Sequence, residues 1–184
     1  NGLTDEAIYS AQLEGASTSR RVARQLLEQN REPKDISERM IVNNYLAMEN
    51  LQDLLDREAT PDFIKDLHRT VTEGTLEIAS DAGTVQSDQN DRVKIFGDSN
   101  QIIYVPPLAS ELPARIQELC DFINNPEPWM HPLLKAMVVH FMMGYDHYFA
   151  DGNGRTARSL FYWMLLKAGF PAARFLVVSD RKSV

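Results

Sequence analysis

Apolar side chains recur at helical spacing along most of the chain, whereas short apolar runs of strand length are confined to one region. Start signals support the helical interpretation. Asp35 and Glu38 have the spacing of a capping box, and Thr60-Pro61 fits the preferences of an N-cap and a first helical turn. The sequence therefore predicts an all-α fold, with helices over residues 35–57, 60–74, 112–123, 132–145 and 155–167.

The segment 133–143 differs from the other helices because apolar residues occupy nearly all its faces and Lys135 is its only charge. This pattern is typical of a helix enclosed by others, so we predict a central buried helix. Two short apolar runs at residues 93–96 and 102–105, separated by Gly97-Asp-Ser-Asn100, predict a β-hairpin. A lone hairpin needs support from the rest of the domain, and its edge can accept a visiting strand.

Length and charge narrow the functional classes. A chain of 184 residues is long enough for one domain with a single core. The 19 basic and 26 acidic residues give a net charge of -7, which argues against a general binder of nucleic acid or anionic membranes. Cys120 is the only cysteine, so an internal disulfide is excluded, and no apolar run has the length of a membrane span. We expect a cytoplasmic protein.

The densest chemistry lies between the last two predicted helices, in the segment 147–158, HYFADGNGRTAR. Histidine accepts a proton near neutral pH, a carboxylate holds Mg²⁺ through hard oxygens, and guanidinium groups bind phosphoryl oxygens. Gly152 and Gly154 permit positive φ angles that turn N–H groups toward an anion, and the following helix directs its N-terminus there. These features predict a nucleotide phosphate site. The alternative is a glycine-rich turn with solvated arginines.

The remaining histidines carry less information. His68 and His131 have no partner pattern, so we predict that they are surface or capping residues. His140 lies two turns before His147, but the chain has neither an HExxH motif nor cysteine pairs. A zinc site is therefore not expected.

The segment 147–158 resembles the signature of the Fic family, HPFxxGNGRxxR, at every specified position except Tyr148, where that family usually has proline. The apolar helix before His147 and the upstream hairpin followed by Pro106-Pro107 also resemble that family. The resemblance covers most of the chain and implies a Fic-type helical domain with a hairpin flap, whose core continues beyond Val184. Tyr148 puts only the rigidity of the turn in doubt, because proline would have fixed φ.

Fic proteins mostly transfer AMP from ATP to a hydroxyl group of another protein. The resemblance implies that His147 is the catalytic base for a tyrosine, threonine or serine hydroxyl, and that Asp151 holds Mg²⁺. Arg155 is implied to bind the β-phosphate and Arg158 the γ-phosphate. The α-phosphate is implied to be cradled by Gly152, Asn153 and Gly154.

Two further features of the resemblance concern specificity. Gly154 stands where the branch similar to the Doc toxin has lysine, which favours nucleotidyl transfer over phosphate transfer. In the family, the hairpin lies beside the active site and holds an extended segment of the target. The flap residues implied to do so here are Ile102, Ile103 and Tyr104.

The N-terminal sequence Ser10-Ala-Gln-Leu-Glu14-Gly15 resembles the inhibitory signature S/T-x-x-x-E-G/N of many Fic proteins. Its position resembles the group with an N-terminal inhibitory helix, here residues 1–17, followed by a core over 18–184. Gly15 is a natural helix end. Glu14 is implied to pair with Arg158 and so to take the guanidinium that the γ-phosphate needs. An exposed glutamate on an ordinary amphipathic helix is the alternative.

The sequence thus predicts a nucleotidyltransferase, specifically a protein adenylyltransferase that uses ATP and Mg²⁺ and is autoinhibited by Glu14. Its partners would be ATP and a target protein, with no membrane and no nucleic acid bound through this domain. Three other functions stay open: a de-AMPylase that uses Glu14, a non-catalytic nucleotide-binding regulatory protein, and a nucleotide hydrolase without a protein acceptor. Assembly into a homo-oligomer also stays open.

Overall fold

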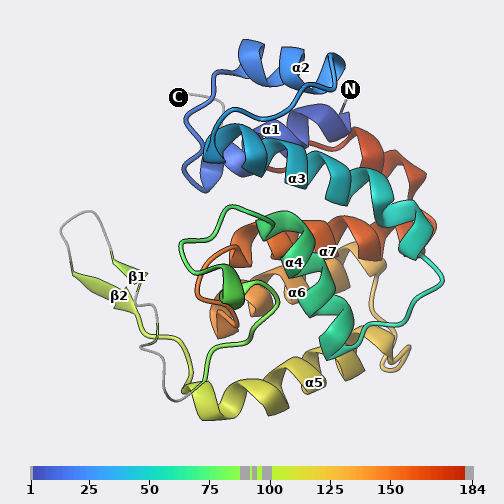
Figure 1. Cartoon of the computed structure of the whole chain (residues 1–184). Helices are drawn as coiled ribbons and strands as arrows, with labels where there is room; N and C mark the ends of the chain where they lie inside the picture. The colour runs from blue at the N-terminus through green and yellow to red at the C-terminus, as the bar shows by residue number, and fades with distance from the viewer. Residues whose placement is uncertain (1, 88–91, 93–94, 97–100, 181–184) are drawn as a thin grey trace.

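Helices form nearly all the regular structure in the computed structural model, which describes residues 2–87, 92, 95–96 and 101–180 (Figure 1). Over these residues the α-helices are α1 (Gly2–Leu13), α2 (Arg20–Glu28), α3 (Ile36–Asn50), α4 (Pro61–Thr72), α5 (Leu112–Asn124), α6 (Pro132–Asp146) and α7 (Asn153–Lys167). Short 3-10 helices cover Leu51–Leu54, Ala79–Asp81, Ala109–Glu111 and Pro171–Phe175. The predicted all-α class is confirmed.

Local sequence signals explain where α3 and α4 begin. The Asp35 carboxylate accepts the Glu38 N–H at 2.8 Å, and the Thr60 hydroxyl accepts the Phe63 N–H at 3.1 Å, with Pro61 in the first turn. All five predicted helices are present, although α3 ends at Asn50 and a 3-10 helix follows it, where the prediction ran to residue 57, and α7 begins two residues earlier than predicted. The prediction of helices did not include α2.

The central helix of the fold is α7, which packs against α1, α3, α4 and α6. Every residue from Arg155 to Leu166 is buried. Most of its buried polar groups have partners, although Arg155 Nε and Ser159 Oγ have none among the described residues: the Trp163 indole N–H, for example, donates to the Leu54 carbonyl at 2.9 Å. The expected central buried helix is therefore present.

The helix at the centre is nevertheless not the one predicted. In α6 only Ala136, Val139, Met143 and Asp146 are buried, while Met137 and Phe141 are exposed. The error arises because an apolar residue on every face shows that a helix can be enclosed, without showing that neighbours are present on each side.

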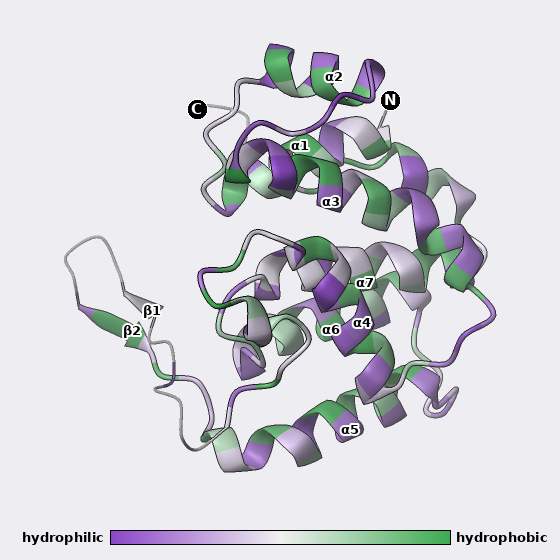
Figure 2. Ribbon diagram, in the orientation of Figure 1, coloured by the Kyte–Doolittle hydropathy of each residue, from purple (hydrophilic) through white to green (hydrophobic). Residues whose placement is uncertain are grey.

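The helices lie on both sides of a middle part that contains α7. In Figure 1 α1, α2 and α3 lie on one side of the molecule, α4, α6 and α7 form its middle, and α5 lies along the opposite side. Hydrophilic and hydrophobic segments alternate along α3 and α5 in Figure 2, as expected of amphipathic helices. A small cluster that includes Ile8, Ala23 and Ile41 joins the first three helices.

The hairpin projects from the helical body (Figure 1). It consists of β1 (Ile95–Phe96) and β2 (Ile102–Tyr104), an antiparallel pair with an irregular register between the Ile95–Tyr104 and Phe96–Ile102 pairs. The predicted hairpin is present, and β2 is one residue shorter than expected. Residues 93–94 and the connection 97–100 lie outside the described part of the chain. No helix in the described ranges is long and apolar enough to span a membrane.

Candidate active site

His147 follows the last residue of α6 and has a left-handed backbone conformation, with φ 50° and ψ 62°. Its N–H still donates to the Met143 carbonyl at 3.1 Å, so the residue stays attached to the helix while its side chain leaves the helical path. Among the described non-glycine residues only Asn30 also has a positive φ. Because non-glycine residues rarely adopt this conformation, the surrounding structure must hold His147 in place.

The environment of His147 favours its neutral form. Burial lowers the pKa of the imidazole most strongly, while a hydrogen bond to the Gly144 backbone opposes this shift. The positive charge of Arg92 lowers the pKa further, and the negative charges of Glu14 and Asp151 raise it. The net direction is downward, which leaves the ring able to accept a proton at neutral pH.

The loop after the base is closed by Asn153, the first residue of α7. Its buried amide donates to the Phe149 carbonyl at 2.6 Å and accepts the Phe149 N–H at 2.9 Å. Gly152 precedes the helix with φ 77°, and a Cβ there would lie 2.5 Å from the Thr72 methyl group. The structure thus needs glycine at position 152 both for its conformation and for close packing.

Gly154 serves a different purpose from the one expected. It lies within the first turn of α7 and lacks the predicted positive φ, because the helix begins at Asn153. A Cβ on Gly154 would overlap Glu14 Oε1 and would lie 3.0 Å from Arg158 Nη1. Glycine therefore allows the Glu14 carboxylate to come close to the helix start, which no side chain caps.

Arg155 is almost completely enclosed, with 1% of its surface exposed. One guanidinium nitrogen donates to the Val71 carbonyl at 3.0 Å, and another lies 3.6 Å from the Asp151 carboxylate. Its Nε has no hydrogen-bond partner among the described residues. The charge of Arg155 thus lies next to Asp151, although few of its donors face solvent.

Asp151 is the acidic residue of the site that faces solvent, with 61% of its side chain exposed. One carboxylate oxygen accepts the Gly152 N–H at 2.5 Å. No cluster of three histidine, cysteine, aspartate or glutamate residues occurs in the part of the chain that the structure describes. A single exposed carboxylate does not suit zinc, but it does suit Mg²⁺, which binds one or two protein carboxylates together with phosphate oxygens and water.

His68 is a site residue that the sequence did not reveal. It is fully buried on α4, where its Nε2–H donates to the Asp151 carbonyl at 2.8 Å and its Nδ1 accepts the Gly83 N–H at 2.8 Å. Its ring stacks on Phe149 at 3.8 Å, and burial lowers its pKa to about 4. The prediction of a surface or capping role for His68 is wrong. The available signal in the sequence was that His68 lies one helical turn after the apolar Ile64, on a face that is buried in the structure.

His131 and His140 have local roles. His131 accepts the Leu133 N–H at 3.2 Å through Nδ1 and so caps α6, as predicted. His140 packs edge-on against Phe161.

The N-terminal motif meets Arg158 in the second turn of α7. The Arg158 guanidinium donates to Glu14 Oε1 at 2.6 Å, to the Ser10 hydroxyl at 2.7 Å and to the Ser10 carbonyl at 3.2 Å. The helix α1 ends at Leu13, and Gly15 has φ 95°. Arg158 is only 8% exposed, so its donors are largely occupied by α1 and the residues after it.

A second buried contact fastens α1 to the segment that follows α7. The Glu6 carboxylate accepts the Ser179 N–H at 3.0 Å and its hydroxyl at 2.6 Å. Burial raises the pKa of Glu6. No pattern in the sequence pointed to this pair.

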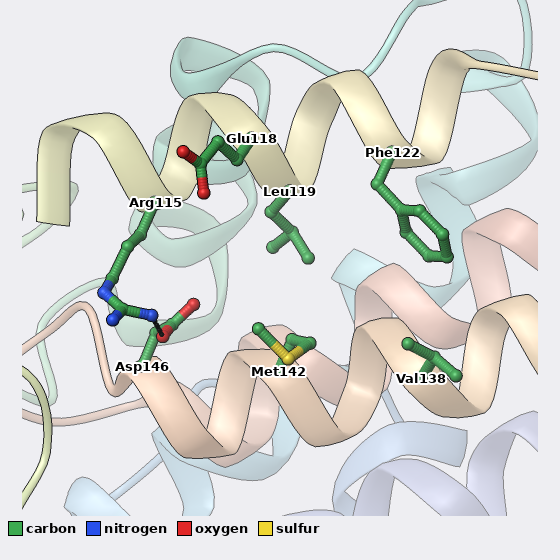
Figure 3. Close-up of a pocket in the computed structure, with 7 residues that line it drawn as sticks. All are labelled: Arg115, Glu118, Leu119, Phe122, Val138, Met142 and Asp146. Atoms are coloured by element: carbon green, nitrogen blue, oxygen red, sulfur yellow. Dashed lines mark hydrogen bonds and ion pairs between the residues drawn. The ribbon is translucent and has the colours of Figure 1, made fainter.

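The flap adjoins the end of α6, next to His147. Ile102 and Ile103 are exposed, and the Tyr104 hydroxyl donates to the Tyr145 carbonyl at 3.0 Å, two residues before His147. Close by, a pocket of about 220 Å³ separates α5 from α6. In Figure 3 Arg115 reaches across one end of this pocket to Asp146.

Comparisons with known proteins agree with this geometry. The model of the Fic/DOC family matches residues 58–165. The protein adenylyltransferase Fic of Nematostella vectensis is 39% identical over 69 residues, which are 37% of this chain and 16% of that protein. That of Drosophila willistoni is 36% identical over 69 residues, 37% of this chain and 14% of that protein.

Solved structures share the fold. A Fic family protein from Desulfovibrio desulfuricans G20 superposes with a TM-score of 0.80 at 21% identity, covering 97% of this chain and 51% of that chain. A Fic domain containing signaling protein from Bacteroides thetaiotaomicron VPI-5482 gives 0.79 at 23% identity, covering 91% and 63%. The chain therefore spans between half and two thirds of these structures, and its match spans about a sixth of the curated relatives.

Proposed function

Because the chain belongs to the Fic/DOC family, we propose that it is a protein adenylyltransferase that transfers AMP from ATP to a hydroxyl side chain of a target protein. The observation that supports this most is that three features lie together. The pKa of His147 is lowered, the Asp151 side chain is exposed, and the uncapped start of α7 lies against the Glu14 carboxylate. A helix N-terminus that accommodates one anion is suited to the phosphates of a nucleotide.

In this mechanism His147 removes the proton from a tyrosine, threonine or serine hydroxyl of the target as its oxygen attacks the α-phosphorus. The new oxygen–phosphorus bond forms while the bond to the β-phosphate oxygen breaks, and pyrophosphate leaves. Asp151 would hold Mg²⁺, which neutralises charge on the phosphates. Most of the rate would come from positioning and electrostatic stabilisation.

The phosphate contacts follow the order of the motif. The N–H groups of Gly152, Asn153 and Gly154 at the start of α7 would cradle the α-phosphate. Arg155 would supply charge to the β-phosphate, and Arg158 would bind the γ-phosphate. Because Arg158 is the most fully engaged of these groups with α1, it is the contact that must be freed before ATP binds productively.

Residues 1–17 would then act as an inhibitory helix on a core of residues 18–184. Ser10 and Glu14 occupy Arg158, and Gly15 lets the chain leave the helix directly after Glu14. A tethered carboxylate acts at an effective concentration on the order of millimolar, so ATP at similar concentration would displace it in part.

The target would lie along the flap, where Ile102 and Ile103 are exposed beside Tyr104 and the base end. An extended segment added to a strand edge would bring a hydroxyl toward His147. The free, buried thiol of Cys120 fits a reducing compartment, and we extend the proposal to the cytoplasm.

The deciding experiment incubates the protein and its Glu14→Gly variant with ATP, Mg²⁺ and cell lysate, followed by mass spectrometry. An adenylate mass on a tyrosine, threonine or serine, absent in His147→Ala, is the expected result. ATP binding by calorimetry without any transfer would instead favour a non-catalytic regulator. Free AMP without a modified protein would favour a hydrolase, and loss of AMP from a modified target would favour a de-AMPylase.

A further inference from the structure

We propose that Tyr148 is a positioning residue for the base, and that its hydroxyl acts through Asp146 and Arg115 to hold the turn at His147. The inference rests on the proposed function only for its kinetic consequences. Proline at position 148 would fix its own φ and favour an extended backbone at the residue before it, whereas tyrosine does neither. The left-handed conformation of His147 must therefore be held by other means.

The side chains on either side of the base are bonded to each other. Tyr148 is fully buried, and its hydroxyl donates to Asp146 Oδ2 at 2.6 Å. Asp146 is also buried, and its other oxygen accepts Arg115 Nη1 at 3.1 Å. Residues 146 and 148 are thus linked across His147, and Arg115 ties the link to α5 (Figure 3).

The backbone of the same turn is held from a second direction. Arg92 donates to the Asp146 carbonyl at 2.6 Å and to the His147 carbonyl at 2.8 Å, and the Gln86 N–H donates to the Tyr148 carbonyl at 2.9 Å. Three consecutive carbonyl groups are therefore fixed. The peptide planes on both sides of His147 cannot rotate without breaking one of these bonds.

These two sets of contacts restrain different parts of the turn at His147. Arg92 and Gln86 fix the carbonyl groups, whereas the Tyr148 hydroxyl joins the two neighbours of His147 through a charge-assisted hydrogen bond. Removing the hydroxyl leaves the buried Tyr148 ring in place and deprives Asp146 of one partner. The base would then sample other orientations while the phosphate end, at the start of α7, stays unchanged.

The experiment uses the full chain in the Glu14→Gly background and compares Tyr148→Phe with Tyr162→Phe. Tyr162 is the matched control, since it is equally buried but its hydroxyl donates to the Leu176 carbonyl at 3.3 Å, accepts the Val178 N–H at 3.2 Å and lies beside Glu6, with no bond to residues 146–148. We expect Tyr148→Phe to lower kcat for AMP transfer about tenfold, with the KM for ATP within about twofold. We expect Tyr162→Phe to leave kcat within about twofold.

A second readout needs no activity. Hydrogen exchange of the His147 amide, which donates to the Met143 carbonyl, and its three-bond HN–Hα coupling report the left-handed turn directly. Both are expected to change in Tyr148→Phe and not in Tyr162→Phe. If the Glu14→Gly protein transfers no AMP, the proposed function fails, while these two measurements still decide the positioning role.

Variants at the surface end of the link cover the case in which Tyr148→Phe fails to fold. Arg115→Met removes one of the two partners of Asp146, and Glu111→Gln removes only the charge of the other partner of Arg115, which lies at 3.0 Å. Arg115→Met should lower kcat and speed exchange of the His147 amide, and Glu111→Gln should do neither. Unchanged kcat and exchange in Tyr148→Phe or, should that variant not fold, in Arg115→Met would overturn the proposal. So would an equal loss of kcat in the matched control.

Discussion

The two ends of the motif reach their conformations by different routes. The base end, residues 146–148, is a left-handed turn held by Arg92, Arg115 and Gln86, all of which lie outside the motif. The phosphate end, residues 152–158, is the start of a helix, shaped by its own glycine and by Asn153. The backbone of the first depends on tertiary contacts, whereas the backbone of the second is set mainly by local sequence, although its arginine side chains have distant partners.

This difference teaches where each kind of substitution should act. Changes at the base end should alter the rate of transfer and leave ATP binding intact, because nothing at that end holds the phosphates. Changes at the phosphate end should alter the binding of nucleotide and metal. The N-terminal segment belongs to the phosphate end, since Ser10 and Glu14 contact Arg158 and Glu14 lies against Gly154.

Replacing His147 should have the largest effect on AMP transfer. In the Glu14→Gly background, His147→Ala should reduce AMP transfer by a factor on the order of 10² to 10⁴, with ATP affinity within about twofold, because only the proton acceptor is lost. Radiolabel transfer and calorimetry measure the two quantities. His131→Ala, at the opposite end of α6, is the control and should retain activity. A parallel fall in ATP affinity would show that the two ends are not separable.

At the phosphate end, the corresponding change is the replacement of Asp151, the proposed Mg²⁺ ligand. Asp151→Asn should lower transfer about a hundredfold and raise the Mg²⁺ concentration needed for half-maximal rate, since an amide is a much weaker ligand than a carboxylate. The amide oxygen can still accept the Gly152 N–H, so the loop should persist. A magnesium titration of the rate is the measurement, with the exposed Asp53→Asn as control. An unchanged magnesium dependence would remove the metal assignment.

Freeing Arg158 is a smaller change in the opposite direction. Glu14→Gly should raise AMP transfer about tenfold at submillimolar ATP, because the carboxylate that competes for the guanidinium is gone. Glu14→Gln keeps most of the side-chain volume beside Gly154 but loses the charge, and should give an intermediate gain. Rates measured at several ATP concentrations separate the two effects. Equal rates in all three proteins would contradict the inhibitory role.

The contrast between the two ends also explains what could be predicted from the sequence. Helices with one apolar face and a capping residue, such as α3 after Asp35, were predicted because both signals are local. The prediction of a phosphate site at residues 152–158 likewise rests on local sequence. The central helix was assigned to α6 instead of α7, because the burial of Arg155 and Arg158 depends on partners far away in the chain.

The base end shows the limit most clearly. The motif pointed to His147, but the groups that hold it come from residues 86, 92 and 115. His68 likewise reaches the Asp151 carbonyl across 83 positions. Contacts at this sequence separation leave no periodic signal, so a single sequence predicts the reacting groups better than the groups that position them.

The smallest expected effect is a change in the pKa of His147, which tests whether a charge at the phosphate end acts on the base. The pKa of His147 should lie below the ordinary histidine value of about 6.5, with burial as the main cause. Glu14 raises this pKa and Arg92 lowers it, so Glu14→Gln should shift it further down and Arg92→Gln should shift it up. Titration of the imidazole by NMR in the nucleotide-free protein measures all three values. Since the base must be neutral, the acid limb of AMP transfer should move in the same directions. An unchanged pKa in both variants would mean that burial alone sets the protonation of the base.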